Sequence, residues 1–163
     1  MKLAVFFQAA LFVSIISSGQ TSVKNDGDID IKYLVGIWQA DTSLNGAAWL
    51  DNYQFFSNNR FIFNFNEYTS NKKILRFSGI FRIVGDTIIF NVKTIYELEG
   101  GVLKRGARAW QDEWVYYNPR IKEIKTECSY FALIRKFRYN TINPCILIDT
   151  RKYFKLENNP QNY

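Results

Sequence analysis

Histidine is absent from this chain of 163 residues, and cysteine, proline and methionine occur only two, three and one times. The missing histidine excludes Ser-His-Asp and Cys-His nucleophiles, proton shuttling by imidazole, and zinc or haem sites that need a histidine ligand. Two cysteines alone cannot complete a four-sulfur metal site. We therefore predict no metal and no cofactor.

Paired carboxylates are a catalytic arrangement that the composition leaves open, since glycosidases need only two of them about 5–9.5 Å apart. Most of the candidate acids stand at expected turns or strand ends, where a solvated carboxylate is the ordinary state: Glu67, Asp86, Glu97, Glu99, Asp112, Glu113 and Asp149. We therefore predict that the protein is not an enzyme.

The N-terminal residues 1–19 are typical of a signal peptide. Met1-Lys2 supplies the charged start, and the apolar run Leu3 to Ile16 is followed by Ser17, Ser18 and Gly19. This run is too short to cross a bilayer comfortably, which takes about 20 residues. We expect cleavage near Gly19 and a secreted or periplasmic product. No cysteine ends the signal, so we expect no membrane anchor.

The net charge of +6 falls by only one when Lys2 leaves with the signal peptide. The excess is scattered, and its one tight cluster, Lys104, Arg105 and Arg108, is typical of a solvated loop. We predict no nucleic-acid partner. Export permits a disulfide between Cys128 and Cys145, which would stabilise the fold by about 3 kcal/mol if their strands lay side by side.

Aromatic residues make up 17% of the chain and fall in short segments with the alternation of β-strands. Phe61, Phe63 and Phe65 share one face of a predicted strand. The clearest hairpin joins two segments at Gly85-Asp86, because glycine accepts the positive φ of a tight turn. With these included, strands are predicted at the following ranges: 49–56, 60–67, 73–84, 87–98, 107–117, 145–149 and 152–156. The last two are joined across Thr150-Arg151.

The segment Lys122 to Tyr139 fits two patterns. Helical spacing relates Ile121, Ile124, Cys128 and Phe131, whereas strand alternation relates Ile124, Cys128, Tyr130, Ala132 and Ile134. Its content of Thr, Tyr, Phe and Ile and the missing N-cap favour a strand.

These segments predict an all-β fold, an antiparallel up-and-down barrel of about 8–10 strands, since closure removes the exposed edges of a long sheet. A β-sandwich is the alternative. We predict a flexible leader at 20–31, the barrel at 32–157 and a disordered tail at 158–163.

The chain resembles the compact, secreted bacterial members of the lipocalin family. Gly36-Ile37-Trp38 matches the Gly-x-Trp of the first lipocalin strand, where the indole closes the floor of the barrel. The hairpin 77–90 and the ending 146–156 are similar to the central and closing strands of such proteins. The resemblance implies a barrel with structural roles for Gly36 and Trp38. The mid-chain Thr-Asp-Tyr-like segment and the amphipathic helix of longer lipocalins are not evident, so no specific ligand is implied.

A lipocalin-like barrel would bind a small apolar or amphipathic molecule, and aromatic walls with a few polar groups are typical of such sites. The predicted ligand-binding residues are Tyr53, Phe63, Arg108, Trp110 and Trp114. In the alternative, the rings fill the barrel and the protein is a solid-cored interaction or glycan-binding module. Ligand identity and oligomeric state stay open.

Overall fold

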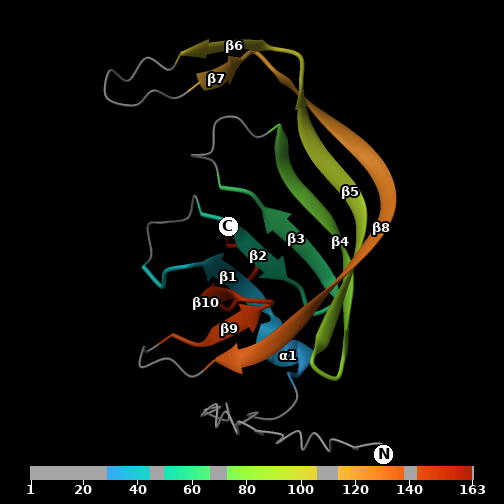
Figure 1. Ribbon diagram of the computed structural model, residues 1–163, viewed down its shortest axis with the longest axis vertical. Helices are drawn as coiled ribbons and strands as arrows, with labels where there is room; N and C mark the ends of the chain where they lie inside the picture. The colour runs from blue at the N-terminus through green and yellow to red at the C-terminus, as the bar shows by residue number, and fades with distance from the viewer. Residues whose placement is uncertain (1–28, 45–49, 67–72, 106–113, 138–142, 163) are drawn as a thin grey trace, which may run out of the picture.

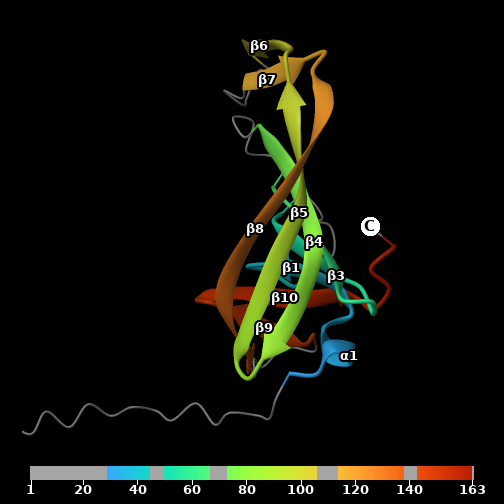
Figure 2. The ribbon, with the colours of Figure 1, turned by 90° about the vertical axis from the view of Figure 1, so that its right-hand side faces the viewer.

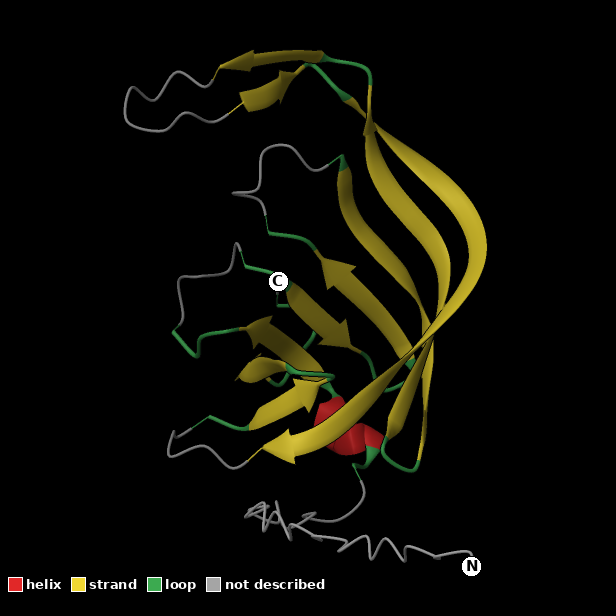
Figure 3. Ribbon diagram, viewed as in Figure 1, coloured by secondary structure: helices red, strands yellow, loops and turns green. Residues whose placement is uncertain are grey.

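The computed structural model describes residues 29–44, 50–66, 73–105, 114–137 and 143–162. These residues are mostly β structure with one short helix (Figures 1 and 3). The elements are α1 (Ile31–Leu34), β1 (Gly36–Ala40), β2 (Asn52–Phe55), β3 (Arg60–Asn64), β4 (Ile74–Val84), β5 (Thr87–Glu99), β6 (Val102–Arg105), β7 (Trp114–Tyr117), β8 (Arg120–Phe137), β9 (Cys145–Ile148) and β10 (Arg151–Glu157).

Eight of the ten strands in the described ranges close into an antiparallel barrel in the order β1-β10-β9-β8-β5-β4-β3-β2. Consecutive strands are neighbours except where the separate β6–β7 hairpin stands between β5 and β8. The first strand meets the last, for example at Ala40 and Tyr153. The predicted up-and-down barrel is therefore confirmed, and the sandwich alternative is excluded.

The tight turns use residues that accept positive φ. Gly85, with a φ of 60°, lies in the two-residue turn between β4 and β5 and confirms the predicted hairpin. The last hairpin turns one residue earlier than predicted, at Asp149-Thr150, because Arg151 already pairs with Ile148. Asp149 adopts the positive φ of 54° there, which aspartate tolerates better than most residues.

The ambiguous segment is the long strand β8. Its even-numbered residues share the inner face, where Tyr130 pairs with Phe90 and Ala132 with Ile88, both of which are core residues. The strand interpretation was correct, because a helix could not pair with β5 along this length.

Both predicted ends of the domain need correction. Ile29 is buried in the core and the Asp30 carboxylate caps α1 by accepting a hydrogen bond from the Lys32 amide, so the ordered domain begins before residue 32. At the other end, residues 158–162 were expected to be disordered. They form a turn, with Pro160 buried and the Asn162 amide donating to the Asn159 carbonyl.

Strands β4, β5 and β8 reach further than their neighbours. The β3–β4 pairing stops at Asn64 and Arg76, whereas β5 and β8 stay paired up to Glu99 and Arg120. Figures 1 and 2 show this long ribbon rising beyond the closed part of the barrel and ending at β6–β7. The barrel therefore has a closed lower part, near α1, and an upper extension with a concave inner face.

Candidate functional site

The lower part of the barrel is filled by aromatic side chains. Trp38, Phe55, Phe61 and Phe90 are fully buried. The Phe61 and Phe90 ring centroids lie 4.8 Å apart, and those of Phe55 and Phe90 lie 6.2 Å apart. These separations are those of packed aromatic pairs. This level of the barrel is therefore filled by the protein's own side chains.

A second layer of apolar side chains rests on this filled core and is only partly buried. It consists of Phe65, Phe77, Ile95 and Tyr130, which we call the upper apolar layer. The Phe77 centroid lies 5.4 Å from that of Phe65 and 6.4 Å from that of Tyr130. Ile95 is the cross-strand partner of Phe77. The four side chains thus form one continuous apolar surface on the inner face, where the closed part of the barrel meets the extension.

A tyrosine cluster adjoins this layer. The Tyr53 hydroxyl lies 3.0 Å from the Tyr130 hydroxyl, and the rings of Tyr53 and Tyr153 pack edge to face. Burial raises the pKa of the Tyr53 and Tyr130 phenols, and it raises that of Tyr153 to about 12 although Arg151 opposes the shift. All three hydroxyls therefore stay protonated at neutral pH and can donate or accept hydrogen bonds.

An ion-pair network stands beside the cluster. The Arg151 guanidinium donates to both Asp41 and Asp51, and Asp51 also accepts from the Asn66 amide. These bonds raise the pKa of Arg151, which keeps its charge. Because the network ties β10 to the segments after β1 and β3, its first role is to hold the upper rim together.

Charged residues continue the inner face beyond the upper apolar layer. Ile95 pairs with Ile124, Glu97 with Lys122, and Glu99 with Arg120. Lys122 also forms an exposed ion pair with Glu99, with 2.6 Å between nitrogen and oxygen. The inner face therefore changes from apolar to charged with distance from the core.

The structure brings two of the predicted ligand-binding residues together. The rings of Tyr53 and Phe63 lie 4.5 Å apart, and both are buried against the upper apolar layer, Phe63 stacking on Phe77 and Tyr53 meeting Tyr130. The backbone of Trp114 lies in β7, paired with Arg105 in the separate sheet. Arg108 and Trp110 lie outside the described residues.

Sequence reasoning missed the residues that surround Tyr53. Phe77, Ile95, Tyr130 and Tyr153 stand on four other strands, β4, β5, β8 and β10. The alternation along β8 had placed Tyr130 on the same face as Ala132 and Ile134, which is correct. No sequence signal showed that this face meets Tyr53.

The disulfide that export would permit is not formed: both cysteines are free thiols, Cys128 exposed and Cys145 buried. Cys145 pairs with Phe137 at the far end of β8 from Cys128. Nine residues of strand separate Cys128 from Phe137, about 30 Å along the chain, whereas a disulfide needs Cα atoms within about 7 Å.

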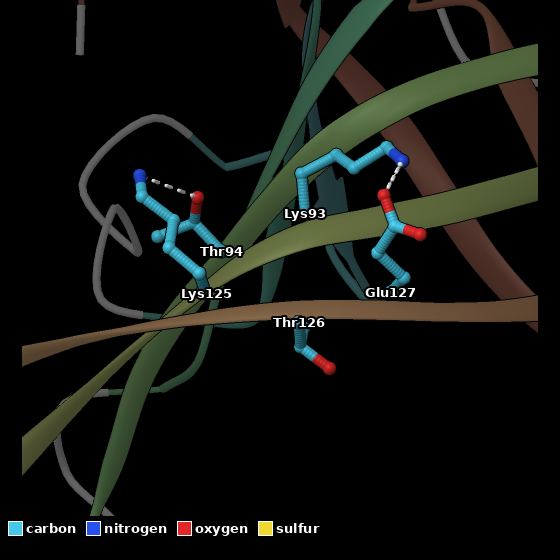
Figure 4. Close-up of a pocket in the computed structure, with 5 residues that line it drawn as sticks. All are labelled: Lys93, Thr94, Lys125, Thr126 and Glu127. Atoms are coloured by element: carbon cyan, nitrogen blue, oxygen red, sulfur yellow. Dashed lines mark hydrogen bonds and ion pairs between the residues drawn. The ribbon is translucent and has the colours of Figure 1, made fainter.

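A hollow of about 500 Å³ lies on the surface where β5 and β8 shift register (Figure 4). It is lined by Lys93, Thr94, Lys125, Thr126 and Glu127. Lys93 pairs with Glu127, and Lys125 with Glu123, so both cations are already engaged. Its open, charge-paired character makes it a weaker ligand site than the upper apolar layer.

No group of three or more cysteine, aspartate or glutamate side chains in the described ranges is arranged to hold a metal ion. Of the acids named as catalytic candidates, Asp86 and Asp149 lie in different turns, on the two sides of β8, and Glu97 and Glu99 lie on β5. Glu67, Asp112 and Glu113 lie outside the described residues. No helix in the described part has the length and apolar character to span a membrane.

No family model matches the chain, and comparison with curated proteins and with solved structures found no match either.

Proposed function

We propose that this protein is a secreted, non-enzymatic, lipocalin-like binding protein whose ligand is a small apolar or amphipathic molecule. The supporting observation is the upper apolar layer, four partly buried side chains on one concave face beside two tyrosine hydroxyls. Apolar walls with a few converging polar groups are the usual composition of small-molecule sites. The N-terminal sequence supports export.

The position of the site differs from that of a deep barrel cavity. The filled core below Phe63 serves as the floor, and the apolar part of the ligand lies on Phe77 and Ile95. The Tyr130 hydroxyl, which lies 3.0 Å from that of Tyr53, supplies a polar group at that surface. A ligand's polar end would face the charged rows that begin at Glu97 and Lys122.

Titration with anilinonaphthalene sulfonate and with a dansylated fatty acid tests the proposal. Phe77→Ala should weaken binding of both probes about tenfold, since a ring on an apolar surface contributes on the order of 1.5 kcal/mol. Ile80→Ala is the matched control, because Ile80 lies on the same strand but is exposed on the outer face. Failure of both probes to bind, or equal weakening by both variants, would contradict the proposal.

A solid-cored interaction module is the second candidate function. The ring-filled lower barrel favours it, as does the β6–β7 hairpin, on which Val102, Leu103 and Tyr117 are exposed and Lys104 lies over the Tyr117 ring. Native mass spectrometry of protein from its own host separates the two candidates. A co-purified small molecule supports the binding protein. A ligand-free protein that binds neither fluorescent probe supports the interaction module.

A further inference from the structure

The upper length of β8 has one free edge. One side of the strand pairs with β5 from Arg120 to Leu133, whereas β9 pairs with the other side only from Ile134 to Phe137. Asp149 also bonds to both backbone groups of Leu133, and among the strands that the structure describes none covers the second edge from Ala132 back to Arg120. Such an edge presents backbone groups that can pair with another chain.

The side chains along this edge alternate between two faces. Figure 4 shows Lys125 and Glu127 on one side of β8 and Thr126 on the other. The first side is the outer face, where Ile121 and Phe131 are both 67% exposed. The side chains of Lys125 and Glu127 are 76% and 83% exposed. Exposed charges at Glu123, Lys125 and Glu127 guard the middle of this edge, as is usual, whereas Ile121 and Phe131 leave a large apolar group exposed on either side of them.

The side chains on the outer face of β8 match those of a second, antiparallel copy of the same strand when Thr126 is the centre of the pairing. Two antiparallel copies with Thr126 opposite Thr126 place Lys125 opposite Glu127, Glu123 opposite the uncharged Ser129, and Ile121 opposite Phe131. The charge pairs across the interface add to the Lys93–Glu127 and Lys125–Glu123 pairs within each copy. Because the arrangement is two-fold symmetric, each of these contacts occurs twice, as in any isologous interface.

Neighbouring registers lack this match. Moving the centre to Lys125 places Lys125 opposite itself and Glu123 opposite Glu127. Moving it to Glu127 places Glu127 opposite itself and Glu123 opposite Phe131. Like charges directly opposite one another destabilise a strand pair, and opposite charges and apolar pairs stabilise it. The sequence therefore selects one register.

We propose that two copies of this chain form a homodimer by antiparallel pairing of their β8 edges, centred on Thr126. The pairing joins β4, β5 and β8 of both copies into one sheet and covers Phe131 and Ile121. The inner faces of the two copies then lie on the same side of the joined sheet. In this register Lys122 of one copy lies opposite Tyr130 of the other.

The oligomeric mass of the wild-type protein and of two charge-reversal variants tests the interface. Light scattering of the purified protein should give twice the mass of the monomer. The monomer mass is 19.2 kDa for the full chain and is smaller if the signal peptide has been removed. Lys125→Glu and Glu127→Lys should each give monomers, because each places two pairs of like charges in the interface. An equimolar mixture of the two variants should restore the dimer, since every pair across that interface is again opposite in charge.

Cysteine cross-linking tests the register independently of the charges. In a Cys128→Ser background, Thr126→Cys should oxidise to a covalent dimer, because directly opposite residues have Cα atoms about 4.5–5.5 Å apart, within disulfide range. Ser129→Cys in the same background is the matched control. Its two copies would be separated by six residues of strand, about 20 Å, and should stay unlinked.

Three results would overturn the dimer. They are a wild-type protein that stays monomeric at the concentration used for cross-linking, a dimer that both charge variants leave intact, and cross-linking of Ser129→Cys as fast as Thr126→Cys. Thermal melts of each variant show whether the barrel is still folded. Because Lys125, Glu127 and Ser129 are exposed, we expect their melts to match the wild type.

Discussion

The Tyr53 and Tyr130 hydroxyls, 77 positions apart in sequence, lie 3.0 Å from one another, but their surroundings differ. Tyr53 is 5% exposed and Tyr130 is only partly buried. Tyr130→Phe leaves the buried Tyr53 hydroxyl without its partner and should cost about 1–3 kcal/mol of unfolding free energy. Tyr53→Phe removes the buried hydroxyl itself, and Tyr130 can turn to water, so the cost should stay below about 1 kcal/mol.

Urea denaturation of the two variants measures this difference directly. The double variant is the control, since both hydroxyls are then gone and its cost should be close to that of Tyr53→Phe. Equal losses for both single variants would contradict the asymmetry.

The buried phenols also predict how stability changes at alkaline pH. A folded-state pKa raised above the unfolded value of about 10 means that only the unfolded chain ionises at first. Stability should therefore be constant below about pH 10 and fall as the pH rises through the Tyr153 pKa of about 12. Tyr153→Phe should flatten this decline. Denaturation at a series of alkaline pH values checks it, and identical slopes for both proteins would count against the buried phenol.

Trp38 links the first strand to α1. Its side chain is fully buried, and its indole N–H donates a 2.6 Å hydrogen bond to the Leu34 carbonyl. Trp38→Ala should cost about 3–5 kcal/mol. Trp38→Phe keeps an aromatic ring but leaves the Leu34 carbonyl without the indole hydrogen bond, and it should cost less than the alanine variant. A melting temperature unchanged in Trp38→Ala would rule out a structural role for the indole.

Gly36 and Gly85 are glycines for different physical reasons, Gly36 because β10 packs closely against it and Gly85 because its turn needs a positive φ. A Cβ on Gly36 would overlap the Glu157 carbonyl oxygen, and its φ is 134°. A Cβ on Gly85 meets nothing within 4 Å, so only its φ of 60° matters. Gly85→Ala should cost about 1 kcal/mol, and Gly36→Ala clearly more. Equal melting temperatures for the two variants would be incompatible with the close approach of β10 to Gly36.

Much of the fold could be predicted from local pattern. Alternation placed Phe61 and Phe63 in the core, and Gly85-Asp86 located the central turn, because both signals depend on a few adjacent residues. The same alternation failed for Asn64, which is buried on the opposite face from Phe63. Its side chain donates to Asn52 on the neighbouring strand, and such a contact depends on strand register.

The candidate site was harder to predict for the same reason. Tyr53 and Phe63 were identified because they stand among aromatic residues in sequence. Tyr130 and Phe77 join them only through the pairing of β3, β4, β5 and β8. Trp110 and Trp114 were predicted as ligand-binding residues because two tryptophans lie close together in that segment. The residues of the upper apolar layer are not distinguished by any local motif.

The position of a bound brominated fatty acid, located by the anomalous scattering of its bromine in a crystal, tests the proposed site most directly. A bromine at the end of the alkyl chain should lie within contact distance of Phe77 and Ile95, above the filled core. Bromine among Phe55, Phe61 and Phe90 inside the lower barrel, or only on the outer surface, would contradict the site.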